Sequence, residues 1–488
     1  MTPLLAWSGV IFPYTTPKAL AFRVLVEIAA VFYFYLALRH PQRFFWSLFS
    51  CHCEPSVAGR SNPAGSGNSS GLLRRTSTSS GLLATTAVVL FFLLVNFLSA
   101  LFGTDFYASF WGNLERGMGV WSLVHFVAWF LMLLAVFRER KDWQRLIKLS
   151  VAVSVLVAIT ALIQRFGGFG ELLPTTDRIY GVIGNAGILA GYLIFNIFLA
   201  GYLFFESIGW KKWFFAISGC LLAIGLLLTG TRGAYLGLMS GIIVLCAFLF
   251  FTPLFKGGMG GFKELKKWPI ICLVIIFVFI VSLFLFRDSN LVKNNAVLAR
   301  LTSFSFSDAT IQSRLILWQD SWRAWQTRPL LGFGPENFES AISKYLSPRL
   351  ASFEAYGTDR SHNLIFDYGV AIGWLGLLSY LMMIGAAGWS LILFVIPAPQ
   401  QRGELQRESS IYTSLSVKGG GEGFSSEPGF WVSPSLETTD EQSKPGMTEK
   451  EKPVFPFSVI FISLLVAYLV QNFFIFDSFV SYLMLFFV

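Results

Sequence analysis

The 488-residue sequence has few charged residues and few cysteines. Only 13% of its residues are charged, whereas 54% are hydrophobic and 17% are aromatic. Soluble domains carry about 25% charged residues, so this composition excludes a soluble protein. The five cysteines show no pattern of paired spacings, which excludes a disulfide-stabilised scaffold. The net charge of +9 is attributed to membrane topology, and no nucleic-acid partner is expected.

The sequence also lacks the acidic motifs that hold catalytic metal ions. The segments predicted to face outward contain no Asp-x-Asp motif, and their aspartates are scattered. Cys51, His52 and Cys53 are too tightly spaced for a usual zinc site and have no second pair of ligands. We therefore expect neither a metal ion nor a cofactor.

Long apolar runs recur along the chain. Windows of about 18 to 22 apolar residues allow a helix to cross the ~30 Å hydrocarbon core of a bilayer. Because lipid offers no hydrogen bonds, such segments must be helical. We expect a single all-α membrane domain over residues 1–488 with about 11 or 12 transmembrane helices. The predicted spans are 19–38, 84–103, 119–137, 146–163, 183–205, 212–229, 233–252, 269–286, 367–395, 457–475 and 478 to the end.

Lys and Arg are unevenly divided between alternate loops, and this predicts the topology. They are frequent in one set of loops and rare in the opposite short loops. The positive-inside rule places the basic set in the cytoplasm, at 39–83, 138–148, 206–212, 253–268 and 396–455. Residues 287–363 then form a large helical loop on the outer side. Two polar cytoplasmic segments, 51–82 and 403–453, are predicted to be disordered because they have little to bury.

Arginines stand at the outer ends of several predicted spans. Arg232 separates two apolar runs in TGTRG, and Arg178 precedes a glycine-rich span that begins near Asn185. Helix packing explains small residues at three- and four-residue spacing, but it does not explain these charges. We interpret the TGTRG segment as an outward-facing hairpin in which Gly230 and Gly233 allow a tight turn.

The long outer loop contains a second arginine in a helical pattern. From 310 to 326 the spacing aligns Arg314 with Trp318, Trp322 and Trp325. Such a stripe is typical of a helix that rests at the lipid headgroups. The GFG at 332–334 lacks the strand and third glycine of a dinucleotide-binding loop and does not indicate that function.

His362 and Asn363 lie just before the chain re-enters the membrane, and His362 is the only histidine on the predicted outer face. Arginine presents a fork of donors that matches phosphate oxygens. Histidine, with an unperturbed pKa near ~6.5, can accept a proton at neutral pH. Together these residue types suit an enzyme that stabilises a leaving diphosphate and deprotonates an acceptor hydroxyl.

Several segments together resemble the O-antigen ligase/polymerase superfamily of bacterial membrane glycosyltransferases. They occur in the expected order and cover most of the chain outside the two polar segments. They are FPYTTPKALAFRVLVEIA, SFWGNLERGMGVWSLVHF, RIYGVIGNAGILAGYL, TGTRGAYLGL, SRLILWQDSWRAWQTRPLLGFGPENF, SHNLIFDYGVAIGWLG and NFFIFDSF. Compared with the family, we expect an incomplete first span and a last helix that is cut at Val488.

The resemblance implies a GT-C-like fold in the bacterial inner membrane, with a periplasmic active site. The implied reaction moves a glycan from undecaprenyl diphosphate to lipid A core or another glycan, without a metal ion. By motif, Arg232 and Arg314 would bind the diphosphate, and His362 would be the base or would orient the acceptor. The further candidates for substrate binding are Arg178, Arg116, Asn363, Asn185 and Trp318.

Three other functions remain open at the level of sequence. A polysaccharide polymerase would use the same donor and differ only in its acceptor. A transporter or flippase for lipid-linked sugars would have polar or broken helices near the membrane midplane in paired repeats. A non-catalytic scaffold is the remaining alternative, and membrane lipids surround the protein in every case.

Overall fold

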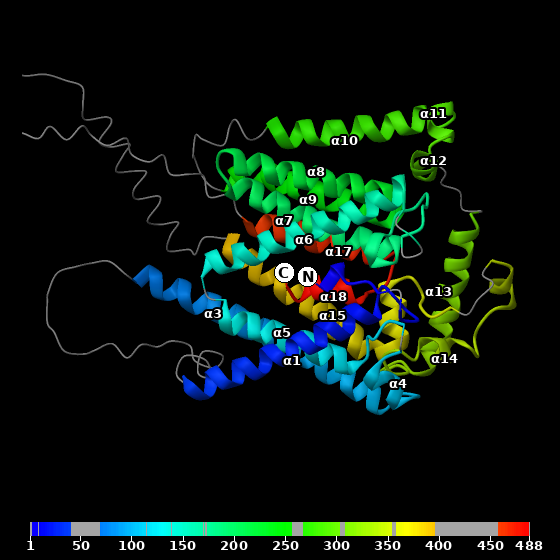
Figure 1. The fold of residues 1–488 in the computed structure, drawn as a ribbon. Helices are drawn as coiled ribbons and strands as arrows, with labels where there is room; N and C mark the ends of the chain where they lie inside the picture. Colours follow the sequence, from blue (N-terminus) through cyan, green and yellow to red (C-terminus); the bar gives the residue numbers. More distant parts are fainter. Residues whose placement is uncertain are drawn as a thin grey trace, which may run out of the picture.

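The fold is an all-α helical bundle, and the prediction of a polytopic membrane protein is confirmed (Figure 1). The computed structural model describes residues 2–7, 9–40, 69–113, 115–137, 139–168, 170, 173–255, 267–302, 308–353, 358–395 and 457–487. Within these ranges, seven helices are long and apolar enough to cross a membrane. They are α1 (Thr16–Arg39), α3 (Ser69–Leu101), α6 (Arg140–Phe166), α7 (Ala186–Glu206), α8 (Trp210–Leu228), α9 (Arg232–Phe255) and α15 (Leu364–Val395).

Shorter helices complete the bundle and the long loop. Three of them are apolar, namely α5 (Val120–Val136), α10 (Lys267–Leu285) and α17 (Phe457–Asn472). The remaining ones are α4 (Phe106–Trp111), α11 (Asn290–Lys293), α12 (Ala296–Thr302), α13 (Ala309–Thr327), α14 (Phe338–Ile342) and α18 (Phe479–Leu485). In Figure 1, α12, α13 and α14 lie at one end of the bundle. The exact count of 11 or 12 spans and the GT-C-like class stay predictions.

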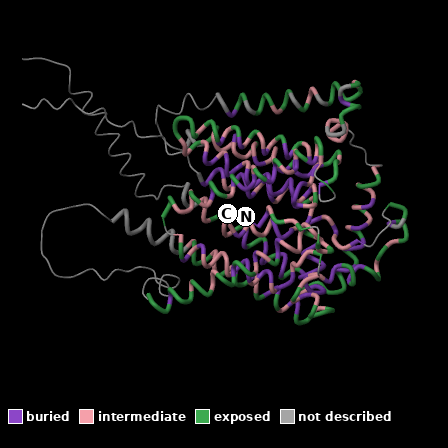
Figure 2. Tube along the Cα trace, viewed as in Figure 1, coloured by how far each residue is buried: buried purple, intermediate pink, exposed green. Residues whose placement is uncertain are grey.

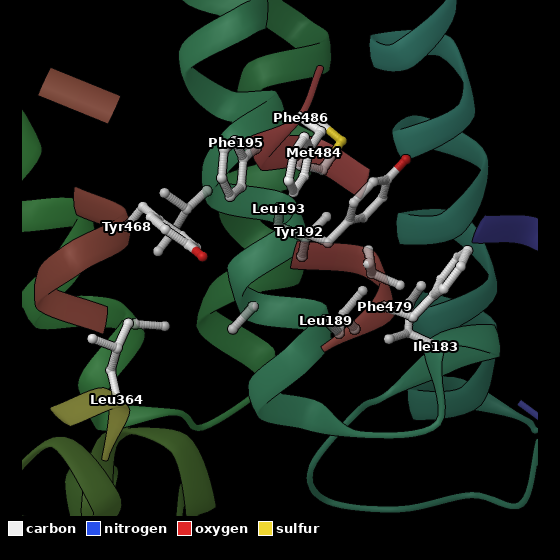
Figure 3. Close-up of a cluster of buried hydrophobic side chains, with 14 of the residues drawn as sticks. Ile183, Leu189, Tyr192, Leu193, Phe195, Leu364, Tyr468, Phe479, Met484 and Phe486 are labelled. Atoms are coloured by element: carbon white, nitrogen blue, oxygen red, sulfur yellow. The ribbon is translucent and has the colours of Figure 1, made fainter. Parts of the chain in front are cut away.

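Helix α7 forms the centre of the bundle, and 72% of the residues in its 18-residue apolar stretch are buried. Figure 3 shows Leu189, Tyr192 and Leu193 of α7 in a cluster with Tyr468 of α17 and Phe479 at the start of α18. The outer helices are different, because α1 and α10 expose many large apolar side chains, visible as green stretches in Figure 2. Such exposure suits contact with lipid tails, which are as apolar as these side chains.

A stripe of glycines brings α9 against α17. Gly233, Gly237 and Gly241 recur every four residues and therefore share one face of the helix. A Cβ atom at Gly237 would lie 2.6 Å from the carbonyl oxygen of Ala467 in α17. Small residues at this spacing allow two helix backbones to approach closely. The stripe fixes the first turn of α9, where Arg232 stands, beside the end of α17.

Helix α15 is broken at Gly373, which has a φ of 66° inside the helix. The segment 329–334, PLLGFG, packs into this break. The amides of Trp374 and Leu375 donate to the carbonyls of Pro329 and Leu330, and the Phe333 amide donates to the Val370 carbonyl. Backbone groups freed by the break are thereby satisfied within the protein, as a membrane interior requires.

Two predicted segments fall partly or wholly outside the described residues. Residues 403–453 lie outside them, as do 51–68. Residues 69–82, which were predicted to be disordered with 51–68, are instead the beginning of α3. In the long loop the predicted helix over 310–326 is confirmed by α13.

Candidate functional site

The turn between α8 and α9 presents Arg232 at the first position of α9. Gly230 has a φ of 63°, the left-handed conformation that glycine adopts at little cost. The Thr229 hydroxyl donates to the Leu226 carbonyl at 2.7 Å and accepts from the Thr231 amide at 3.3 Å. The tight turn predicted from TGTRG is therefore present. Gly233 has a different role, because its Cβ would lie 2.7 Å from Phe474 Cβ in a close helix contact.

The long loop approaches Arg232 from two sides. The Arg232 Nε donates to the carbonyl of Arg300 in α12 at 2.9 Å. Its Nη1 lies 3.0 Å from Oδ2 of Asp308, with both side chains about 30% exposed. The other oxygen of Asp308 accepts from the Thr310 amide and caps α13. Arg232 therefore ties the α8–α9 turn to both α12 and α13.

Arg178 and Arg314 also lie close to Arg232 and Arg300. The Arg178 Nε donates to the Thr229 carbonyl at 3.1 Å, on the same turn. Desolvation, followed by the charges of Arg300 and Arg314, lowers the pKa of Arg178. Like charges disfavour the charged form only when they are close. Arg178, Arg232, Arg300 and Arg314 thus form one group, which we call the arginine cluster.

The arginine cluster has an excess of positive charge. Asp308 is a carboxylate in contact with it, and Arg232 holds the pKa of Asp308 below its usual value through a hydrogen bond. The Arg300 Nε is buried and has no hydrogen-bond partner among the described residues. Guanidinium groups that converge with one counter-charge make a site for an anion with several oxygens, such as a diphosphate.

Arg300 was not among the residues predicted from the sequence. It lies in the seven-residue helix α12, in a part of the loop without a recognisable motif. Only the contact between α12 and the α8–α9 turn reveals its place beside Arg232. The basic residue in LARLT was the one available signal, and it is weak.

His362 lies in a strained turn just before α15. It is half-buried and has a φ of 55°, which is uncommon for a residue other than glycine. Its ring centroid lies 5.3 Å from that of Phe476. The neighbouring Ser361 carbonyl accepts a hydrogen bond from Trp318 Nε1 at 3.0 Å, which fixes the turn to α13. Strained residues held by their surroundings occur often at functional sites.

The turn at 473–477, which we call the FFIFD turn, connects His362 with the arginine cluster. Phe474 packs against Gly233, next to Arg232. Phe473 contacts Trp318, which follows Arg314 by one helical turn on α13, with a centroid separation of 5.9 Å. Phe476 contacts His362. The structure therefore gathers the predicted diphosphate-binding arginines and the predicted base at one end of the bundle.

Arg116 lies on the His362 side of the FFIFD turn. It forms an ion pair with Asp359, and its guanidinium carbon stands 4.2 Å from the centroid of the Phe476 ring. These contacts place Arg116 beside the histidine rather than in the arginine cluster.

The two asparagines among the binding candidates have structural partners. Asn185 caps α7 through the amides of Gly187 and Ile188. Asn363 is fully buried: its oxygen accepts from two amides of α15, and its nitrogen donates to the Phe473 carbonyl at 3.0 Å. These hydrogen bonds let Asn363 position the His362 turn, and its role in substrate binding stays a prediction.

The tryptophan stripe of α13 faces protein instead of lipid headgroups. Trp325 is 2% exposed and packs against Trp374 of α15 with a centroid separation of 4.3 Å. Trp318 stacks against Phe366 with a centroid separation of 5.9 Å. Trp322 alone of the three is exposed. The expected interfacial helix is therefore wrong for most of the stripe, because α15 supplies an apolar surface that the sequence pattern does not reveal.

Comparison with known protein families finds a similarity. A family model described as O-antigen ligase matches residues 216–381. The matched part runs from α8 to α15 and includes Arg232, Arg300, Arg314 and His362. No curated protein sequence matches the chain. Residues 216–381 are therefore similar to O-antigen ligase, which supports the O-antigen ligase/polymerase superfamily, whose members are glycosyltransferase-like enzymes.

Proposed function

We propose that the protein is a glycosyltransferase that moves a glycan from undecaprenyl diphosphate to lipid A core, at the periplasmic face of the bacterial inner membrane. The observation that carries this proposal is the arginine cluster, joined to His362 by the FFIFD turn. Three of its four arginines lie in the region that matches the O-antigen ligase model. A polymerase that transfers the glycan to another glycan would use the same residues.

In the proposed reaction the arginine cluster binds the diphosphate oxygens, while the lipid tail stays in the bilayer. His362 accepts the proton of an acceptor hydroxyl, and the hydroxyl oxygen attacks the anomeric carbon. The bond between that carbon and the diphosphate breaks, and the leaving group takes the electron pair. The guanidinium groups stabilise the negative charge that develops on the leaving group.

This reaction is expected to proceed without a divalent metal ion, because the guanidinium groups supply the positive charge. Purified protein, given undecaprenyl-diphosphate-linked glycan and lipid A core, should transfer glycan at an unchanged rate in EDTA. The product is measured as the mobility shift of the acceptor on a gel. Loss of transfer in EDTA, followed by recovery with Mg²⁺ or Mn²⁺, would overturn the metal-independent proposal.

The acceptor is tested by deleting the gene in its native host. We expect all long polysaccharide chains to disappear from the lipid anchor, which a gel of the surface polysaccharide would show. Retention of one repeat unit on each anchor would indicate a polymerase instead. A transporter is favoured if vesicles translocate glycan-lipid equally well after Arg232→Ala, Arg314→Ala and His362→Ala.

A further inference from the structure

A cavity with acidic walls lies beside the FFIFD turn. It is bounded by Asn96 of α3, by Glu336, by Arg360, by the start of α15 and by Phe476 and Asp477. Its carboxyl groups are those of Glu336, Asp367 and Asp477, and among the described residues its lining has one cationic side chain, Arg360. We call this space the acidic cavity.

Two carboxylate oxygens of the acidic cavity are buried and have no hydrogen-bond partner among the described residues. They are Oε2 of Glu336 and Oδ2 of Asp367. The Glu336 side chain is 3% exposed, and Asp367 is 6% exposed. A buried acceptor that is left unsatisfied costs about 1–3 kcal/mol. Both side chains line the cavity, so donors of a ligand bound there would satisfy these oxygens.

The other oxygen of each carboxylate is already engaged. Oε1 of Glu336 accepts from Arg360, and Oδ1 of Asp367 accepts from the Ser361 amide at 2.7 Å. Both carboxylates are therefore held in position with one oxygen left for a ligand. Glu336 also has a φ of 62°, and it and His362 are the only residues besides glycine with positive φ in the described part of the chain. The strain thus falls on the cavity wall and on the proposed base.

The acidic cavity is close to His362. Phe476 lines the cavity and contacts the His362 ring, and Arg360 is two residues before His362 in the same loop. The acidic excess repels phosphate groups, whereas carboxylate oxygens accept hydrogen bonds from sugar hydroxyls. The rings of Phe476, Tyr368 and Tyr482 add apolar surface, as is usual in small-molecule sites.

We propose that the acidic cavity is the acceptor subsite, in which Glu336 and Asp367 bind hydroxyl groups of an uncharged sugar. This inference rests on the proposed glycosyl transfer. Opposite charge separates the two substrates, because the diphosphate of the donor binds at the arginine cluster and a phosphate-free acceptor sugar binds at the cavity. The hydroxyl to be glycosylated then lies on the same side of the FFIFD turn as His362.

The proposal is tested with Asp367→Asn in the purified full-length protein. The amide oxygen still accepts from the Ser361 amide, so the His362 turn keeps its support, while an NH₂ group replaces Oδ2. With lipid A core oligosaccharide as acceptor, we expect the acceptor KM to rise about 10-fold or more. The KM for undecaprenyl-diphosphate-linked glycan should stay unchanged. Binding of the oligosaccharide alone, followed by calorimetry, should weaken by the same factor.

Asp320→Asn is the matched control. Asp320 is 1% exposed, and its Oδ2 accepts from the Ser347 amide. Its Oδ1 has no hydrogen-bond partner among the described residues but lies 3.5 Å from Nη1 of Arg323 in an ion pair. It lies on α13 and does not line the acidic cavity. Its replacement should leave both KM values unchanged, and the thermal unfolding midpoint reports any loss of folding in either variant.

The outcomes separate the subsite from the proposed function. A raised donor KM with an unchanged acceptor KM in Asp367→Asn would assign the cavity to the donor sugar and overturn the proposal, as would unchanged binding of the acceptor. If the wild-type protein binds the oligosaccharide but never transfers glycan to it, glycosyl transfer fails and the binding experiment still decides the subsite.

Discussion

Replacing Arg232 by alanine is expected to lower the kcat/KM for glycan transfer by about 10²-fold or more, the usual cost of removing a donor that stabilises transition-state charge. Arg232 is the member of the arginine cluster with contacts to both α12 and α13. The rate is measured from the mobility shift of the acceptor, with purified protein and saturating acceptor.

Arg232→Lys separates charge from geometry. Lysine keeps the positive charge, but it cannot donate to the Arg300 carbonyl and to Asp308 with a planar fork, so it should rescue little of the activity. Arg323→Ala is the matched control, because Arg323 lies on α13, is 54% exposed and pairs with Asp320 outside the cluster. Equal activity of Arg232→Ala and Arg323→Ala would remove Arg232 from the proposed site.

Replacing Glu336 by alanine is expected to destabilise the protein by about 3–5 kcal/mol, because it leaves a buried charge without its partner. The side chains of Glu336 and Arg360 are 3% and 12% exposed. Desolvation lowers the pKa of Arg360, but the carboxylates of Glu336, Asp367 and Asp359 raise it overall. Arg360 thus stays protonated in the variant, and its unpaired charge destabilises the folded protein. The thermal unfolding midpoint in detergent measures the effect.

Two comparisons sharpen this prediction. Arg140→Ala breaks an ion pair with Glu206 in which the arginine is 59% exposed, so it should cost at most about 1 kcal/mol. Replacing both partners, Glu336→Leu with Arg360→Met, should recover much of the stability, since the buried charges are then absent together. A midpoint for Glu336→Ala as close to wild type as that of Arg140→Ala would contradict the prediction.

The arginines at span ends could be recognised from the sequence. A charged side chain between two apolar runs costs free energy in a membrane and therefore indicates a function. Arg178 and Arg232 stand out in this way, and Arg314 stands out by its helical alignment with the tryptophans of α13. The structure places the three arginines in one group. Arg300 and Glu336 could not be recognised. Both lie in the long loop, where neither apolar periodicity nor a known motif identifies one polar residue among many.

The residues of segment 329–334 show a second limit. The sequence indicates only that Pro329 and the following glycines end a helix. Their contact with the break at Gly373 depends on the three-dimensional path of a loop that returns to α15 some forty residues later in the chain. Asn363 shows a related limit, because the sequence does not reveal that its side chain forms hydrogen bonds with the backbone of α15 and of Phe473.

The FFIFD turn has a thermodynamic consequence. Five consecutive residues contact the first turn of α9, the tryptophan of α13, the histidine and the acidic cavity. A small displacement of this pentapeptide when lipid-linked glycan binds would change the affinity for the acceptor. Linkage then requires reciprocity: whatever factor the first ligand applies to the affinity of the second, the second applies equally to the first.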